Sequence, residues 1–288
     1  MKVAVTGANG FIGRHVLAEL ARRDLEVTLL LRPESMAPES ARGRRVVRLD
    51  IANTAANAFE LAGRPDVLIH LAWGGLPNYK ALHHFERELP MQYAFLKNMV
   101  SAGLAQLVVS GTCFEYGMQS GPLSEDMPAL PSNPYGLAKD TLRRQLQYLQ
   151  RERPFALSWA RLFYLYGEGQ APNSLLPLLR SAVARGDETF AMSGGEQLRD
   201  YLSAPEVAAH LVALALGSRD CGIVNICSGR PVSVRTLVEG WIREHGWRIT
   251  PALGHFPYPD HEPMAFWGDR RKLDRCLAQA SLSQTPHR

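Results

Sequence analysis

The sequence predicts an α/β fold, a doubly wound parallel sheet with helices on both faces, and three observations support it. Short hydrophobic runs rich in β-branched residues alternate with helical stretches through the first half of the chain, which is typical of such a sheet. The runs are nearly continuous in hydrophobicity, as expected of strands buried on both faces. A glycine-rich turn follows the first run and leads into a helix. We therefore expect a ligand site at the carboxyl ends of the strands.

The expected strands of the sheet cover residues 2–6, 26–31, 46–49, 66–71, 106–110 and 155–165. Helices are expected at residues 11–22, 82–102 and 135–151. After residue 167 we expect helices at 175–185, 204–216 and 233–245, a short strand pair within 189–199, and a buried strand at 223–227. The last forty or so residues are rich in proline and aromatic residues, so we expect loops and a small subdomain there.

Composition excludes several classes of protein. With 46% hydrophobic and 21% charged residues among 288, the chain is neither disordered nor fibrous. The formal charge of +4 and the short basic runs argue against nucleic-acid binding. The sequence shows neither a signal peptide nor a long apolar span, so we expect no membrane partner. Four cysteines without a Cys-x-x-Cys pair predict reduced thiols, no metal site and a cytoplasmic location.

The glycine-rich turn is the strongest single motif. Gly7, Asn9, Gly10, Phe11, Ile12 and Gly13 lie between the first strand and the first helix. Glycines there allow a tight turn and a close approach to a pyrophosphate, which the N–H groups of the helix start attract. We therefore predict a Rossmann-type dinucleotide site, the alternative being a tight turn that binds nothing.

The end of the second strand indicates which dinucleotide is bound. Arg32 stands where a cofactor without a 2′-phosphate usually meets an acid, and an arginine suits the 2′-phosphate. We therefore expect NADP(H), with NAD(H) possible, although a solvated loop arginine would look the same. Asp50 and Ile51 follow the third strand and are placed to touch the adenine; an acid that caps the next helix would give the same pattern.

A tyrosine and a lysine four residues apart form the candidate catalytic pair. Tyr135 and Lys139 share one helix face, and a nearby cation favours the phenolate, so the tyrosine can exchange a proton near neutral pH. A second pair, Tyr93 and Lys97, precedes the strand expected at 106–110 and the Thr112 that comes after it, whereas Tyr135 follows both. Because the hydroxyl of Thr112 belongs at the carboxyl edge of the sheet, we choose Tyr135 and assign Tyr93 to packing.

These motifs together resemble the extended short-chain dehydrogenases/reductases of the NAD-dependent epimerase/dehydratase family, which act mostly on nucleotide sugars. The matching segments span nearly the whole chain in the family's order: residues 6–13, 70–72, 110–117 and 135–139, Arg161 with residues 166–167, and residues 199–201 and 225–229.

The resemblance implies roles for individual residues. Tyr135 would be the general acid/base, Lys139 would hold the nicotinamide ribose, and Thr112 would hydrogen-bond the reacting oxygen. The cofactor path would be lined by Leu71, Ala72, Trp73 and Ser110. The substrate side would comprise Thr112, Cys113 and Tyr164, with Ser174 and Leu175 at the start of a nucleotide-clamping helix and Arg199 at the diphosphate. The family's habit of pairing through two long helices implies a homodimer formed by residues 82–102 and 135–151.

Departures from the family pattern narrow the chemistry. Cys113 and Phe114 stand where dehydratases carry an acid, so dehydration is disfavoured. Glu115 is expected to point away from the site if the segment is extended, although a bulge would reverse that. Tyr164 replaces a family asparagine, and residues 258–263 lack the second phosphate arginine.

We therefore expect an NADPH-dependent reductase of the C4 keto group of a nucleotide-linked 4-keto-6-deoxyhexose. The alternatives are a nucleotide-sugar 4-epimerase and, less favoured, a dinucleotide-sensing protein that performs no chemistry. Residues 1–167, with residues 203–228 returning to them, would form the dinucleotide-binding domain. Residues 168–202 and 229–288 would form the substrate-binding subdomain, small for an epimerase and therefore in favour of the reductase.

Overall fold

A seven-stranded, all-parallel sheet forms the centre of the described part of the chain. The structure is a computed structural model that describes residues 1–259 and 262–283. The strand order is β11-β7-β5-β4-β1-β2-β3, which reverses direction at β1 and confirms the predicted doubly wound fold. The strands are β1 Lys2–Thr6, β2 Glu26–Leu31, β3 Arg45–Arg48, β4 Val67–His70, β5 Gln106–Thr112, β7 Ala156–Leu162 and β11 Gly222–Ile226.

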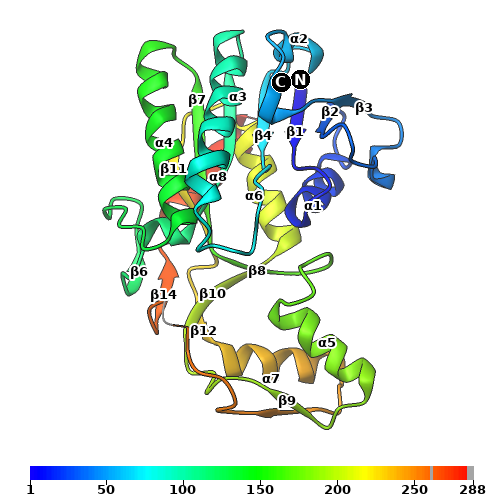
Figure 1. Cartoon of the computed structure of the whole chain (residues 1–288), viewed down its shortest axis with the longest axis vertical. Coiled ribbons are helices and arrows are strands. Elements are labelled where there is room, and N and C mark those ends of the chain that lie inside the picture. Colours follow the sequence, from blue (N-terminus) through cyan, green and yellow to red (C-terminus); the bar gives the residue numbers. More distant parts are fainter. Residues whose placement is uncertain (260–261, 284–288) are drawn as a thin grey trace.

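Helices cover both faces of this sheet and bury one hydrophobic layer on each (Figure 1). Leu17 of α1, Leu211 of α6 and Leu273 of α8 belong to one layer. Phe59 of α2, Phe95 of α3 and Leu142 of α4 belong to the other. The helices are α1 Phe11–Leu20, α6 Ala204–Leu216 and α8 Arg271–Ser283 on the first face, and α2 Ala58–Leu61, α3 Leu89–Ser101 and α4 Pro134–Glu152 on the second.

A smaller lobe lies beyond the carboxyl ends of the strands, at the bottom of Figure 1. Its own core packs α5 against α7, with Leu179, Phe190 and Trp241 among the buried residues. A sheet of order β12-β10-β8 and two strand pairs complete this part of the molecule. Its elements are β6 Gly121–Leu123, β8 Tyr164–Tyr166, α5 Leu175–Arg185, β9 Thr189–Ala191, β10 Leu198–Ser203, β12 Pro231–Ser233, α7 Val234–His245, β13 Thr250–Ala252 and β14 Phe266–Gly268.

Three expected elements were wrong in detail. The strand expected over 155–165 ends at Leu162, because Phe163 packs into a separate cluster and residues 164–166 pair with β10. The strand pair expected within 189–199 does not form, since β9 pairs with β13 and β10 with β8 and β12. The long helix expected over 82–102 begins as a π-helix at His84–Glu88 before α3; Pro90, at the start of α3, lacks the N–H that a continuous α-helix would need there.

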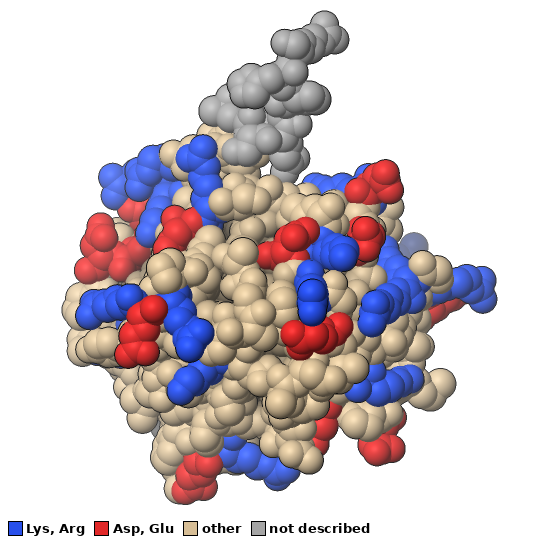
Figure 2. Space-filling view, turned by 90° about the horizontal axis from the view of Figure 1, so that it is seen from above, with Lys and Arg blue, Asp and Glu red and all other residues tan. Residues whose placement is uncertain are grey.

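Charged side chains of both signs lie on the surface. On the face seen from above, Figure 2 shows Lys and Arg side chains interspersed with Asp and Glu. The helices of the described residues include none that is both long and apolar enough to cross a membrane.

Candidate active site

The glycine-rich turn packs so closely that side chains are excluded from two of its positions. A Cβ on Gly13 would lie 2.1 Å from the carbonyl oxygen of Gly7, and one on Gly7, where φ is +69°, would lie 2.8 Å from the backbone N of Ala72. The helix that follows starts at Phe11 with no side-chain cap and no acidic residue in its first turn. Its first N–H groups are therefore available to an anion, and the turn fits the pyrophosphate of a dinucleotide.

Two arginines lie at the end of β2, where the sequence predicts the adenine end of the dinucleotide. Arg32 is exposed at the end of β2, and the guanidinium of Arg48, which sequence reasoning missed, donates to the carbonyl oxygens of Arg32 and Ser35. Asn9 ties the turn to the same loop through a 2.6 Å hydrogen bond to the Met36 carbonyl oxygen. Asp50 is exposed and caps a 3₁₀ helix, Ile51–Asn53, by accepting a hydrogen bond from the Ala52 N–H at 2.9 Å. Helix capping was the alternative to adenine contact that the sequence left open for this residue.

Thr112, Tyr135 and Lys139 come together where β5 meets α4. The side chain of Thr112 is near enough to that of Tyr135 to favour its phenolate, and Lys139 Nζ donates to the Ser110 carbonyl oxygen at 2.8 Å. Asn133 caps α4 by accepting from the Gly136 N–H, which holds the first turn that carries Tyr135. Lys139 Nζ lies 5.9 Å from the centre of the Tyr135 ring. The local geometry therefore assembles a phenol, a hydroxyl and an ammonium at the carboxyl edge of the sheet.

Aromatic rings enclose Tyr135, whose side chain is almost entirely buried. The ring centres of its neighbours lie between 5.2 and 6.4 Å away and belong to His84, Tyr79, Trp73 and Phe114. His84 accepts from the Trp73 indole N–H at 3.1 Å and contacts the Asn78 carbonyl oxygen at 2.8 Å. His84 is thus a packing residue of the site itself.

Burial dominates the electrostatics of these groups. It lowers the pKa of Lys139 to about 7, against the opposing negative charges of Glu115 and Glu88. It raises the pKa of Tyr135, and the neighbouring Tyr79 adds to this shift. Without a ligand, Tyr135 therefore keeps its proton, and Lys139 is close to losing its own.

A buried chain of polar side chains between β1, β4 and the start of α3 was missed by sequence reasoning. His70 contacts the Thr6 hydroxyl through Nδ1 and the Gln92 amide oxygen through Nε2, both at 2.9 Å. Gln92 donates to Glu88 at 3.0 Å, and Glu88 accepts from the Gly74 N–H at 3.0 Å. The chain thus links β1 to the loop after β4. Its signal in the sequence was a pair of polar residues, Glu88 and Gln92, four apart on an otherwise apolar helix face.

Glu115 faces the interior of the protein. The segment Cys113–Tyr116 is a 3₁₀ turn, and Glu115 accepts hydrogen bonds from the Thr112 N–H at 2.9 Å and the Trp159 indole. It also forms an ion pair with Arg161 at 2.7 Å, both side chains being at most 1% exposed. Burial raises the pKa of the Cys113 thiol, which keeps its proton. The Glu115 carboxylate therefore fixes the backbone of Thr112 and is itself fixed by Trp159 and Arg161.

The predicted substrate side contains an acid that sequence reasoning missed. Arg199 is buried and pairs with Glu262 at 3.0 Å, between the rings of Tyr164 and Phe266. Ser174 is the N-cap residue of α5 and makes no capping hydrogen bond with its side chain, while Leu175 opens the helix as expected. Within the described residues, His, Cys, Asp and Glu form no cluster of three that could hold a metal ion.

Comparison with known proteins identifies the family. Residues 3–227 match the NAD dependent epimerase/dehydratase family. A curated relative, dTDP-6-deoxy-L-talose 4-dehydrogenase (NAD(+)) of Aggregatibacter actinomycetemcomitans, is 32% identical over 93% of this chain and 99% of its own length. The UDP-glucose 4-epimerase of Erwinia amylovora is 26% identical over 96% of this chain and 92% of its own length.

A solved structure, MoeE5 in complex with UDP-glucuronic acid and NAD, is 28% identical and superimposes with a TM-score of 0.80 over 96% of this chain and 93% of its own. The family match and the shared fold confirm the expected Rossmann-type dinucleotide enzyme. The chain belongs to the NAD-dependent epimerase/dehydratase family of extended short-chain dehydrogenases/reductases.

Proposed function

We propose that the protein reduces the C4 carbonyl of a nucleotide-linked 4-keto-6-deoxyhexose with NADPH. The observation that carries this proposal is the placement of Tyr135, in the first turn of α4, beside Thr112 at the end of β5, with Lys139 Nζ 5.9 Å from the centre of the Tyr135 ring. In such an arrangement a carbonyl oxygen can accept hydrogen bonds from both hydroxyl groups while a hydride reaches its carbon.

Thr112, Tyr135 and Lys139 have different roles in this reaction. The bound cofactor would supply the hydride. Thr112 orients and polarises the carbonyl, and Tyr135 gives its proton to the oxygen that becomes the hydroxyl. The pKa of Tyr135 is raised by burial, so the group waits in its protonated form, as an acid for reduction must. Lys139 stabilises the phenolate that remains and is positioned to contact the cofactor ribose.

Dehydration does not fit the same site. Elimination of water from a sugar needs an additional acid and base beside Thr112. The residues there are Cys113, a buried thiol that keeps its proton, and Phe114. The next carboxylate, Glu115, is held by Trp159 and Arg161. These contacts support an oxidoreduction that leaves the carbon skeleton and its oxygens in place.

The relatives support chemistry at C4 and leave two reactions to compare. Oxidation of a 6-deoxy-L-talose at C4 is the reverse of the reduction proposed, and it needs the same three residues. A nucleotide-sugar 4-epimerase is the second candidate, favoured by the Erwinia relative. Chain length does not separate them, because this chain covers nearly all of both relatives. The buried pair Arg199–Glu262 does not separate them either, because both substrates carry a nucleotide diphosphate.

The cofactor preference rests on charge at the end of β2. Arg32 is exposed there and Arg48 lies beside it, so two guanidinium groups border the position of a ribose 2′-phosphate. We therefore assign NADP(H), with NAD(H) as the alternative. The NAD(+)-dependent 4-dehydrogenase among the relatives supports that alternative. Glycines 7, 10 and 13 would hold the pyrophosphate, and Leu71, Ala72, Trp73 and Ser110 would line the path to the nicotinamide.

The substrate would extend from Tyr135 toward the smaller lobe. Cys113 and Tyr164 border the sugar in this arrangement, and Ser174 and Leu175 begin the helix that faces the nucleotide. The homodimer through the surfaces of α3 and α4 stays a prediction; Leu137 on α4 is 46% exposed and gives that surface an apolar contact.

Turnover with defined sugars tests the proposal. Purified protein is mixed with NADPH or NADH and a panel of nucleotide-linked 4-keto-6-deoxyhexoses and hexoses. Consumption of one cofactor for each ketosugar is the expected result. Interconversion of C4 epimers without net cofactor use would establish the epimerase, and cofactor binding without turnover of any sugar would establish the sensing protein.

A further inference from the structure

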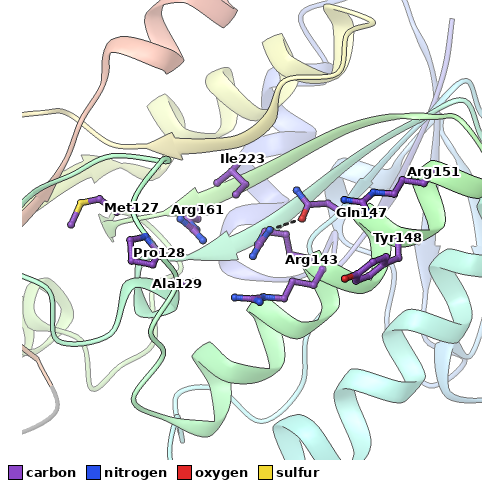
Figure 3. A pocket seen from close by; sticks show the side chains of 10 residues that line it. Met127, Pro128, Ala129, Arg143, Gln147, Tyr148, Arg151, Arg161 and Ile223 are labelled. Atoms are coloured by element: carbon purple, nitrogen blue, oxygen red, sulfur yellow. Dashed lines mark hydrogen bonds between the residues drawn. The ribbon is translucent and has the colours of Figure 1, made fainter.

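A cavity of about 350 Å³ opens beside α4 at the edge of the large sheet, where β11 is the outermost strand. Its walls come from the loop 127–129, from α4, and from β7 and β11 (Figure 3). The lining does not include Thr112, Tyr135 or Lys139, so this cavity is separate from the site described above.

Arginine dominates the lining of this cavity. Among the described residues no Asp or Glu lines it, whereas four arginines do: Arg143, Arg144, Arg151 and Arg161. Three of them lie on α4. Behind this wall, Asp140 accepts hydrogen bonds from Arg143 and Arg144, and Glu115 accepts one from Arg161. Two carboxylates thus neutralise part of four guanidinium charges, and a positive excess remains.

Arg161 gives the cavity an unsatisfied donor. Its side chain is 1% exposed, and Nε is used by Glu115. Nη2 lies 4.0 Å from Asp140 Oδ1, and Nη1 is buried and makes no hydrogen bond. Figure 3 shows this side chain extending from β7 toward the loop that carries Pro128 and Ala129. A buried guanidinium N–H without an acceptor is unfavourable, and an anion in the cavity would satisfy it.

The remaining walls fit a small anion rather than a peptide or a nucleic acid. The opening is bordered by Tyr148, over whose ring the Arg151 guanidinium lies at 5.1 Å, and Met127 and Ile223 supply apolar surface. Guanidinium forks match the geometry of phosphate oxygens. We propose that this cavity binds a phosphate dianion, either free or as the phosphate of a small phosphomonoester, with Arg161 at its inner end.

Titration calorimetry with inorganic phosphate tests the proposal on the whole protein saturated with NADPH, so that the glycine-rich turn is filled. A double variant, Arg144→Gln with Arg151→Gln, removes two exposed arginines from the mouth and leaves the buried ion pair intact. Each lost charge-assisted hydrogen bond weakens binding by about tenfold or more. The matched control, Arg22→Gln with Arg185→Gln, removes two exposed arginines elsewhere and leaves the affinity unchanged.

A second titration with a hexose 1-phosphate separates the two sources of the ligand. Tighter binding of the ester than of inorganic phosphate identifies a phosphomonoester site, and weaker or equal binding identifies a site for free phosphate. Two results would overturn the proposal: equal phosphate affinity in the mouth variant and the parent protein, or the absence of saturable binding by both anions. A dimer in which the partner copy covers the cavity would give the second result, the absence of binding. Gel filtration and cross-linking through α4 would reveal such a dimer.

Discussion

The ammonium group of Lys139 lies over the face of the Trp73 indole, with Nζ 4.0 Å from the ring centre. The indole shields the lysine from water, and burial lowers the pKa of Lys139 to about 7. Trp73 follows β4 in the loop that Glu88 fastens through Gly74. Trp73 thus covers the ammonium group and contributes to the burial that lowers its pKa.

Replacing Trp73 by alanine should shift the pH dependence of the reaction. The charged form of Lys139 is the active one, so kcat/KM for reduction should fall as the pH rises through about 7. The Trp73→Ala variant admits water, raises the pKa of Lys139 and moves this fall to higher pH. Leu137→Ala, on the exposed side of α4, is the control. An unchanged profile in the Trp73 variant would show that another group sets this limb.

Removing the Tyr135 hydroxyl should nearly abolish turnover. The Tyr135→Phe variant keeps the aromatic enclosure and loses the proton donor, so kcat should fall by about 10²–10⁴-fold. Cofactor affinity, measured by the quenching of protein fluorescence, should stay close to that of the parent. Tyr93→Phe, in the second tyrosine–lysine pair, should retain full activity. Persistence of most of the activity in Tyr135→Phe would refute the acid/base assignment.

Reversing the charge of Arg32 should change the preferred cofactor. The side chain is exposed at the end of β2, where a 2′-phosphate would meet it. In Arg32→Asp the ratio of kcat/KM with NADPH to that with NADH should fall by at least about tenfold, the loss of one charge-assisted contact. Arg22→Asp, which alters another exposed arginine two residues beyond the end of α1, should leave the ratio unchanged. A ratio unaffected by Arg32→Asp would favour NAD(H).

Neutralising Glu115 should destabilise the fold rather than alter the reaction directly. The carboxylate accepts hydrogen bonds from the Thr112 N–H and the Trp159 indole and forms an ion pair with Arg161. Breaking a buried ion pair costs about 3–5 kcal/mol of stability. Urea denaturation of Glu115→Gln should show this loss in the free energy of unfolding. Glu239→Gln, in the exposed pair with Arg235, should have little effect. Equal stability of the Glu115 variant and the parent would mean that the pair adds nothing to the core.

The buried His70 should make the fold sensitive to acid. Burial, aided by the charge of Lys139, lowers the pKa of His70 from its ordinary 6.5 to about 3. Between these values the unfolded chain binds a proton that the folded protein does not, so this stability is complete above pH 6.5 and is lost as the pH falls toward 3. In urea denaturation, His70→Gln should flatten the fall in unfolding free energy over this range, whereas His255→Gln should not. Parallel curves for all three proteins would contradict the assignment.

Much of the fold and of the candidate site could be predicted because local sequence decides them. Buried parallel strands require continuous hydrophobic runs, and the strand β1, the turn at Gly7 and the helix after it occur where expected. Thr112, Tyr135 and Lys139 are brought together by the order of strand and helix along the chain. These features depend on periodicity and spacing, which one sequence displays.

The rest depends on contacts between distant segments. Glu262 meets Arg199 across 63 residues, and Glu115 meets Arg161 across 46. The residues next to Glu262 and Glu115 in the sequence do not indicate which arginine each acid will contact. The break after Leu162 has the same cause, since residues 164–166 find their partner strand only in β10. The charge of a phosphate-binding residue could therefore be predicted, but not whether another side chain already neutralises it.

The fate of the hydride tests the central proposal most directly. The protein is incubated with a nucleotide-linked 4-keto-6-deoxyhexose and NADPH deuterated at the transferable position of nicotinamide C4, and the product is examined by proton and deuterium NMR. We predict one deuterium at C4 of a 6-deoxyhexose for each NADPH oxidised, and no transfer with Tyr135→Phe. Oxidation of NADPH without deuterium at C4 of the sugar, or unchanged ketosugar after the cofactor has bound, would contradict the account.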